Sequence, residues 1–215
     1  MNSLFERLAR VHTALVCDVL DSLGHRTGAM DFRIHSLAGP GRVVGRAFTF
    51  ASFPTDEPEA VPYEQLLGGY AHLSPGDVVV LATNGELIAG IWGELLSTAA
   101  RARGAMGAVT DGLTRDVAEI DRMGFPVFAR GASPLDSAGR QAVRDYGETV
   151  TCGGVEVHMG DIVLADATGV VVIPAALAED AVRLAEEKNT GENVVRLELE
   201  RGDDPAEVFE RHGIL

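Results

Sequence analysis

The sequence predicts an α/β fold with mixed sheets. The length of 215 residues suits one unit with a sizeable core, and 46% of the residues are hydrophobic while 23% are charged, as in globular chains. Strand and helix patterns alternate between residues 87 and 129, which is typical of parallel strands joined by crossover helices. Residues 155–174 are instead short apolar runs separated by tight turns, which favours antiparallel pairing. The two patterns together predict a mixed sheet.

The first part of the chain supplies a helix and two strands. In residues 3–23, leucine and valine recur mostly every three or four positions, which predicts a helix that ends at Gly24. Residues 42–50 and 77–82 are rich in β-branched and aromatic side chains and predict strands. Residues 52–67, between these strands, contain three prolines and several acids before an apolar helical stretch, so we expect the first half of this segment to be a loop.

Alternating patterns fill the middle of the chain. Short runs of β-branched residues are separated by segments with helical periodicity, and an Asp-Gly turn at 111–112 follows the second of these runs. This arrangement predicts a strand-helix-strand-helix-strand unit. Its expected elements cover residues 87–91, 94–103, 105–110, 115–123 and 125–129.

The end of the chain is acidic and helical. The helical pattern runs from Glu179 to Gly202 and is followed by a short tail with the apolar residues Ile214 and Leu215. We therefore expect a single unit over residues 1–215 with a carboxy-terminal helical extension from about residue 179.

The charge balance excludes several classes of function. Eighteen basic and 32 acidic residues give a net charge of −14, which repels phosphates and anionic lipid, and there is no basic run. No apolar run approaches the roughly 18 residues of a membrane span. Cys17 and Cys152 have neither a CxxC nor a zinc-like spacing, so we expect reduced thiols. These features predict a cytoplasmic protein without nucleic-acid or membrane partners.

Gly93 marks the first candidate site. It precedes a predicted helix that would direct the backbone N–H groups of Glu94, Leu95 and Leu96 outward, and such a helix start binds a carboxylate or a phosphate. A plain strand-to-helix turn, in which the glycine only permits tight packing, explains the same pattern. The glycine spacing matches neither a Walker A loop nor GxGxxG, which disfavours nucleotide binding.

Arg115 and Asp116 form the second candidate site, directly after a predicted strand and its Asp-Gly turn. An arginine there can clamp a carboxylate with two parallel hydrogen bonds, and an aspartate can bind a hard divalent cation. The alternative is a surface ion pair beside a helix start.

Other kinds of site find less support. The six histidines show no HxH or HExxH arrangement, and no serine lies in a GxSxG motif. Residues 93–116 contain no lysine, so this segment offers no amine for a Schiff base. The segment therefore gives no support for covalent catalysis by a lysine.

Four segments together resemble one known family. They are GELL at 93–96, RGAMGAVTDGLTRD at 103–116, GFPVFARG at 124–131 and CGGVEVHMGDIVLADATGVVVIP at 152–174. The chain is similar along nearly its whole length to the RraA-like family, which includes class II aldolases acting on 4-hydroxy-4-methyl-2-oxoglutarate and 4-carboxy-4-hydroxy-2-oxoadipate. The resemblance implies a swivelling β/β/α architecture, a homotrimer or homohexamer, and an active site at a subunit interface.

The resemblance also implies roles for the two candidate sites. Asp116 would ligate Mg²⁺ or Mn²⁺, Arg115 would hold the pyruvyl end of the substrate, and the backbone of residues 93–96 would receive a carboxylate. The branch of the family that inhibits a ribonuclease lacks the aspartate of this Arg-Asp pair. The presence of Asp116 therefore favours the enzyme.

Two further acids are implied by the same resemblance. Glu94 would orient a water molecule on the metal, and a glutamate from the carboxy-terminal helix of a neighbouring subunit would complete the site. The pattern ENVVRLELERG suggests Glu192 for that second role, with Glu187 as the alternative.

The implied activity is retro-aldol cleavage of a small anionic 4-hydroxy-2-oxo diacid to pyruvate and a carbonyl acid, with decarboxylation of oxaloacetate, through a pyruvate enolate. A metal and an arginine would stabilise the negative charge that develops on the keto oxygen. Two alternatives remain open: a non-catalytic regulator that binds a ribonuclease or helicase, and a sugar-acid lyase on the same scaffold. Residues 52–63 depart from the family pattern, so they do not indicate the distal part of the substrate.

Overall fold

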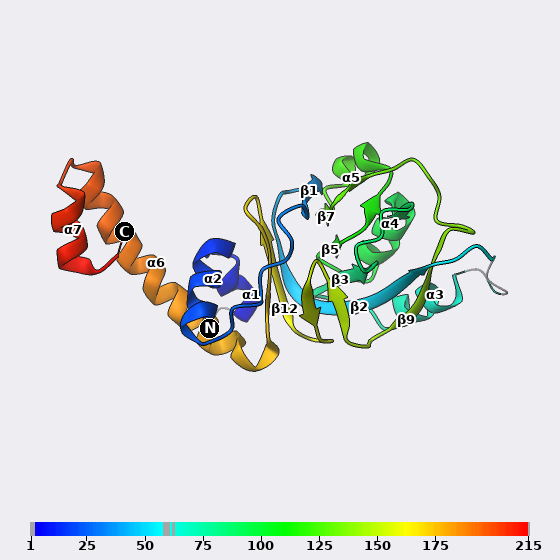
Figure 1. The fold of residues 1–215 in the computed structure, drawn as a ribbon, viewed down its shortest axis with the longest axis horizontal. Coiled ribbons are helices and arrows are strands. Elements are labelled where there is room, and N and C mark those ends of the chain that lie inside the picture. The colour runs from blue at the N-terminus through cyan, green and yellow to red at the C-terminus, as the bar shows by residue number, and fades with distance from the viewer. Residues whose placement is uncertain (1–2, 58–60, 62, 215) are drawn as a thin grey trace.

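The computed structural model describes residues 3–57, 61 and 63–214. Figure 1 shows a body of sheets and helices from which the carboxy-terminal helices α6 and α7 project as an arm. The short helices α1 and α2 lie where the arm joins the body. Among the described residues, no helix is both long and apolar enough to span a bilayer.

The body is built on an eight-stranded mixed sheet, as the sequence predicts. Strands β2, β3, β5 and β7 run parallel to one another, whereas β12, β13, β9 and β1 join antiparallel. The order is β1-β7-β5-β3-β2-β12-β13, with β9 paired to the far part of β2. The bounds are His35–Ala38 (β1), Val43–Pro54 (β2), Asp77–Ala82 (β3), Gly107–Thr110 (β5), Val127–Ala129 (β7), Gln141–Tyr146 (β9), Ile162–Asp166 (β12) and Gly169–Ile173 (β13).

Strand β2 is longer than the sequence predicts. Residues 52–54, expected to belong to a loop, pair with β9 through Ser52 and Val143, Phe53 and Ala142, and Pro54 and Gln141. Pro54 is tolerated because it is the last residue of the strand. The prediction of a loop was wrong here since the pairing partner lies nearly ninety residues away along the chain.

Two small sheets complete the strands. One is parallel and consists of β4, β6 and β8, and the other is the antiparallel hairpin of β10 and β11. The strand predicted over residues 87–91 begins only at Gly90. The bounds are Gly90–Trp92 (β4), Leu113–Thr114 (β6), Gly131–Ala132 (β8), Val150–Cys152 (β10) and Val155–Val157 (β11).

Helices cover one face of the main sheet, and the β10–β11 hairpin covers the other. On the helical face, α3 (Glu64–Tyr70), α4 (Glu94–Ala102) and α5 (Val117–Met123) pack with Phe48 and Phe50 in one core cluster. On the same face, α2 and the first half of α6 pack on β12 and β13 in a second cluster. The opposite face packs on the hairpin in a third cluster, and the core beneath α3, α4 and α5 lies under the candidate site.

The amino-terminal helix is interrupted, contrary to prediction. Helix α1 covers Leu4–Leu8 and α2 covers Thr13–Ser22. The guanidinium of Arg42 donates hydrogen bonds to the carbonyl oxygens of Leu8 and Val11, which satisfies backbone groups that a continuous helix would pair internally. Asp166 accepts hydrogen bonds from both the backbone N–H and the hydroxyl of Thr13 at the start of α2.

The arm contains one more helix than the sequence predicts. After the 3₁₀ turn Ala175–Leu177, α6 runs over Ala178–Glu200, and α7 (Pro205–His212) replaces the expected short tail. Asp204 caps α7 by accepting from the N–H groups of its first turn. Ile214 lies near Gly191 of α6, so it packs on its own chain.

Candidate functional site

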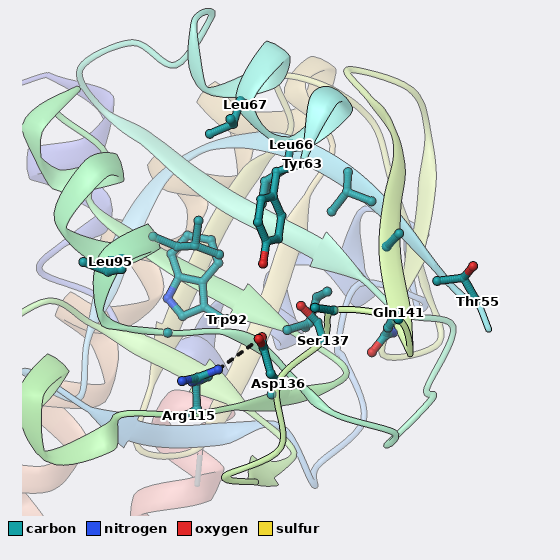
Figure 2. Close-up of a pocket in the computed structure, with 18 of the residues that line it drawn as sticks. Thr55, Tyr63, Leu66, Leu67, Trp92, Leu95, Arg115, Asp136, Ser137 and Gln141 are labelled. Carbon is teal, nitrogen blue, oxygen red and sulfur yellow. Dashed lines mark ion pairs between the residues drawn. The ribbon is translucent and has the colours of Figure 1, made fainter. Parts of the chain in front are cut away.

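A cavity of about 460 Å³ lies between α3, the start of α4, β9 and residues 136–139. Figure 2 shows its side chains, with Arg115 and Asp136 on one side and Gln141 and Thr55 on another. Both candidate sites from the sequence meet in this cavity. Its lining is Thr55, Glu57, Tyr63, Leu66, Leu67, Gly90–Gly93, Leu95, Leu96, Arg115, Asp116, Asp136–Gly139 and Gln141–Val143.

Gly93 allows the two candidate sites to approach each other. It is the N-cap of α4 in an extended conformation, and as a glycine it has no side chain of its own to cap the helix. A Cβ atom at this position would lie 2.8 Å from Asp116 Oδ2 and 2.9 Å from Arg115 Cγ, so any larger residue would displace both side chains. The glycine is therefore required for more than a tight turn.

The start of α4 is already engaged by the protein itself. The backbone N–H of Glu94 donates to Asp116 Oδ2 over 3.2 Å, so it is not free as the sequence analysis expected. Gly93, Leu95 and Leu96 line the cavity, with the side chain of Leu95 78% exposed at its edge. The helix start and the Asp116 carboxylate thus form one unit.

Asp116 adopts a left-handed backbone conformation, with φ of 56° and ψ of 34°, at the N-cap of α5. Left-handed geometry is uncommon outside glycine and is tolerated best by aspartate and asparagine. This conformation explains why α5 begins at Val117 rather than at residue 115 as predicted. Such strained residues cluster at functional sites.

Arg115 lies between two carboxylates. Its Nε is 3.4 Å from Asp116 Oδ2, and its Nη1 is 3.2 Å from Asp136 Oδ1. Its backbone N–H donates to the Trp92 carbonyl oxygen over 2.8 Å, which ties residue 115 to β4. The side chain is about one-third exposed, so an entering anion can reach it.

Asp136, Tyr63 and Gln141 were missed by the sequence analysis. Asp136 reaches the cavity because an isolated β-bridge pairs it with Gly90, and the sequence around Asp136 carries no motif. Tyr63 is the N-cap of α3, and Figure 2 shows its hydroxyl pointing into the space above Asp136. For Asp136 and Gln141, the signal exists only in the strand pairings that bring them to the cavity.

Trp92 forms the floor of the cavity. It is 1% exposed, its Nε1 donates to the Ser97 hydroxyl over 2.8 Å, and its ring stacks on Phe125. The indole is thus held rigidly between α4 and the core, which fixes the wall against which a ligand would pack.

The other predicted acids lie apart from the cavity lining. The carboxylate of Glu94 accepts a hydrogen bond from the Thr98 hydroxyl one turn along α4. Glu192 lies on α6, in the arm that projects from the body (Figure 1). Glu187, on the same helix, pairs with Arg183 over 3.1 Å. The structure therefore brings together Gly93, Arg115 and Asp116, and leaves Glu192 and Glu187 outside the cavity of their own chain.

The cavity suits a hydrated divalent cation better than a fully protein-ligated one. The described residues contain no group of three or more histidine, cysteine, aspartate or glutamate side chains placed to hold a metal. Mg²⁺ is commonly held by one or two carboxylates together with water and substrate oxygens. Asp116 and Asp136, both beside Arg115, supply hard oxygen donors of that kind.

Comparison with known proteins places the chain in a family. The profile described as RraA-like, Aldolase/RraA, matches residues 13–172, which include the elements that surround the cavity. The chain belongs to the RraA-like family. The resemblance noted in the sequence is therefore confirmed.

Several named proteins are similar in sequence to this chain. A protein of Halalkalibacterium halodurans named "Putative 4-hydroxy-4-methyl-2-oxoglutarate aldolase" is 30% identical over 83% of this chain and 80% of its own length. Another with the same name, from Halorhodospira halophila, is 31% identical over 74% of this chain and 93% of its own length. Protein DlpA of Legionella pneumophila is 28% identical over 87% of this chain, which spans only 31% of that relative's length.

Solved structures of the family share the fold. Streptomyces coelicolor RraAS2, described as an unusual member of the RNase ES inhibitor RraA protein family, superposes with a TM-score of 0.81 at 30% identity, covering 90% of this chain and 95% of that chain. The RNA-processing inhibitor RraA from Thermus thermophilis gives a TM-score of 0.60 at 25% identity, covering 74% and 92%. The mixed α/β architecture predicted from the sequence is confirmed.

Proposed function

We propose that this RraA-like protein cleaves a 4-hydroxy-2-oxo acid by a metal-dependent retro-aldol reaction that releases pyruvate. The observation that carries the proposal is the contact of Arg115 and Asp116 with the Gly93 helix start inside one cavity. Aldolase names among the relatives support the reaction class.

Arg115 would bind the 2-oxo acid end of the substrate. The substrate carboxylate and keto oxygen can replace Asp136 on the guanidinium, because the existing pair is part-exposed and therefore weak. Gly93, Leu95 and Leu96 at the start of α4 also line the cavity, and the positive end of the helix dipole favours negative charge there. As the carbon–carbon bond breaks, charge grows on the keto oxygen, and Arg115 stabilises it where it develops.

Asp116, with Asp136 as a second donor, would hold Mg²⁺ or Mn²⁺. A bound divalent cation supplies positive charge beside the keto oxygen of the substrate. The hydrogen bond from the Glu94 N–H and the left-handed backbone of Asp116 would hold this carboxylate in a fixed orientation. The protein thus contributes two oxygen donors and the geometry that fixes one of them.

A proton must leave the 4-hydroxyl group during cleavage. Glu94 lies next to the site on α4, and its carboxylate is held by Thr98. Glu192 of a neighbouring subunit, or Glu187 in its place, would approach from outside in a homotrimer or homohexamer. The projection of α6 away from its own cavity supports that arrangement.

Pyruvate release from a panel of 4-hydroxy-2-oxo acids and oxaloacetate tests the proposal. Lactate dehydrogenase and NADH report pyruvate as it forms, with and without Mg²⁺. We expect turnover that depends on the metal. If none of the compounds in the panel releases pyruvate, the proposed function is wrong.

A non-catalytic role is the second candidate. The specific observation in its favour is that RraAS2, described as belonging to an RNase ES inhibitor family, is as similar as the aldolase-named relatives. The net charge of −14 suits binding to a basic protein surface. A ribonuclease inhibition assay of the same preparation distinguishes the two roles.

A further inference from the structure

Gln141 is a buried amide without a partner. Its side chain is 3% exposed at the start of β9, and neither Oε1 nor Nε2 has a hydrogen-bond partner among the described residues. Buried polar atoms are almost always paired in folded proteins, because an unpaired one forfeits its hydrogen bonds to water. Gln141 also lines the cavity, so a ligand there can supply the missing partners.

Strand pairing fixes the position of Gln141. It lies opposite Pro54 at the end of β2, and its backbone N–H donates to the Ser137 carbonyl oxygen over 2.9 Å. Figure 2 shows Gln141 and Thr55 across the cavity from Arg115. A substrate held by its 2-oxo acid end at Arg115 would therefore present its other end to this amide.

The Gln141 side of the cavity carries no cation. Arg115 is the only positively charged residue among the described lining residues, and Glu57 adds a negative charge. Residues 52–63 contain three acids and no lysine or arginine. Two guanidinium groups lie outside the lining and contact it: that of Arg144 donates to the Thr55 hydroxyl, and that of Arg140 donates to the Asp136 carbonyl oxygen.

This charge distribution selects against a second carboxylate. A carboxylate beside Gln141 would lose water, meet one neutral amide and share the cavity with Glu57, without a guanidinium in the lining on that side to compensate. A hydroxyl or carbonyl group needs no charge compensation. A hydroxyl group can accept from Nε2 and donate to Oε1, which satisfies both orphan atoms.

We propose that Gln141 selects a neutral, hydrogen-bonding group at the distal end of the substrate, so that the substrate is a singly charged hydroxylated 2-oxo acid rather than a diacid. This inference rests on the proposed function. In the cleavage the C3–C4 bond breaks, the 4-hydroxyl proton leaves, and C4 becomes a neutral aldehyde. The bonding electron pair passes to the pyruvate enolate, which takes up one proton at C3.

Three substrates that share the reacting atoms test the selection. They are 4,5-dihydroxy-2-oxopentanoate, its apolar isostere 4-hydroxy-2-oxohexanoate, and the diacid 4-hydroxy-4-methyl-2-oxoglutarate. We expect kcat/KM for the dihydroxy acid to exceed that for each of the others by at least about tenfold. A preference for the diacid would overturn the inference while leaving the proposed function intact.

Variants of Gln141 test whether this side chain determines the preference for a neutral distal group. Gln141→Met keeps the volume and removes the amide, so the advantage of the dihydroxy acid over its apolar isostere should vanish. Gln141→Arg adds a cation and should favour the diacid. Ser52→Ala is the matched control, because Ser52 is buried with an unpartnered hydroxyl on the paired strand but does not line the cavity. An unchanged preference in Gln141→Met would contradict the assignment.

A binding measurement tests the inference without turnover. Calorimetry compares 2-oxoglutarate with its 5-methyl ester, which has the same chain and a neutral acceptor at the distal end. The wild-type protein should bind the ester at least about tenfold more tightly, and Gln141→Arg should reverse the order. Tighter binding of 2-oxoglutarate by the wild type would overturn the inference, whether or not any aldol is cleaved.

Discussion

The body and the arm of this molecule differ in the size of the apolar core that each one builds. In the body, both faces of the main sheet are covered, and Trp92, Phe48 and Phe50 are no more than 2% exposed. In the arm, beyond the point where α6 leaves the body, Val195 and Val208 are buried against each other's helices, while Leu197 and Phe209 are about half exposed.

This difference separates what one chain can do alone from what it cannot. The body holds the cavity, with Arg115, Asp116 and Gln141 already assembled. The arm presents exposed apolar residues and the acids that family resemblance places at a neighbouring active site. Exposed apolar side chains gathered on a projecting helix pair are typical of a protein interface. Substitutions in the body should therefore reduce activity at the cavity itself, whereas substitutions in the arm should reduce it through assembly.

Loss of the Asp116 carboxylate should have the largest effect. Asp116→Asn should abolish pyruvate formation, because the amide removes the charged oxygen donor while it keeps a residue that tolerates the left-handed backbone. Chelation of the wild type should have the same effect, with Mg²⁺ or Mn²⁺ restoring activity. Full turnover by the variant or by metal-stripped protein would refute metal dependence, and thermal unfolding checks that the fold survives.

Arg115→Lys should have the second-largest effect on activity, with a loss in kcat of about 10²-fold and a smaller change in KM. Lysine keeps the positive charge but loses the planar fork that contacts two oxygens at once. Steady-state kinetics of pyruvate release separate the two constants. A raised KM at nearly unchanged kcat would mean that Arg115 only anchors the substrate, and catalysis would then depend on the metal and Glu94.

These two residues also show how far the sequence leads. Arg115, Asp116 and Gly93 could be predicted because each follows a strand end within one contiguous segment. Asp136 and Gln141 could not, since they reach the cavity through pairings with Gly90 and Pro54 that no local pattern encodes. The mixed sheet was predictable from alternating and hairpin patterns.

Two helix and strand boundaries were predicted wrongly because they depend on contacts between residues far apart in the chain. The break between α1 and α2 depends on Arg42, about thirty residues away. The last residues of β2 depend on β9. Helix α7 was missed although its cap, Asp204 followed by Pro205, is a recognisable start signal.

Disruption of the arm should reduce activity by a smaller factor through assembly. Light scattering should show three or six copies of the wild type. Leu197→Arg should shift the protein toward monomers without unfolding it, because Leu197 is 53% exposed in the chain itself. Pyruvate release should fall in parallel with dissociation. A stable monomer with full activity would contradict the role of the arm.

Substitution of the two glutamates on α6 sharpens this prediction. Glu192→Gln should lower kcat by about 10²-fold if Glu192 acts on protons at a neighbouring site, with the oligomer intact. Glu187→Gln serves as the matched control on the same helix, since Glu187 is paired with Arg183 in its own chain. The reverse outcome would transfer the role to Glu187.

The smallest expected effect concerns stability and again separates the body from the arm. Burial alone would raise the pKa of Asp166, but hydrogen bonds from Thr13 and Thr168 outweigh it and hold the pKa below its usual value. In the arm, hydrogen bonding by His212, together with Arg211, lowers the pKa of Glu198. Both carboxylates therefore stabilise the folded chain above their unfolded pKa values of about 4, and this contribution disappears as the pH falls through the lowered folded values.

Asp166→Asn should consequently cost about 1–2 kcal/mol of unfolding free energy near pH 6, because it weakens charge-assisted hydrogen bonds that join β12 to α2. Urea unfolding at a series of pH values should show the gap between variant and wild type closing below about pH 4. Glu198→Gln should leave global unfolding nearly unchanged and increase amide exchange in α7 alone, since its partners Arg211 and His212 lie on that helix. If Glu198→Gln instead lowers global stability as much as Asp166→Asn, the arm and the body unfold as one unit and the distinction between them fails.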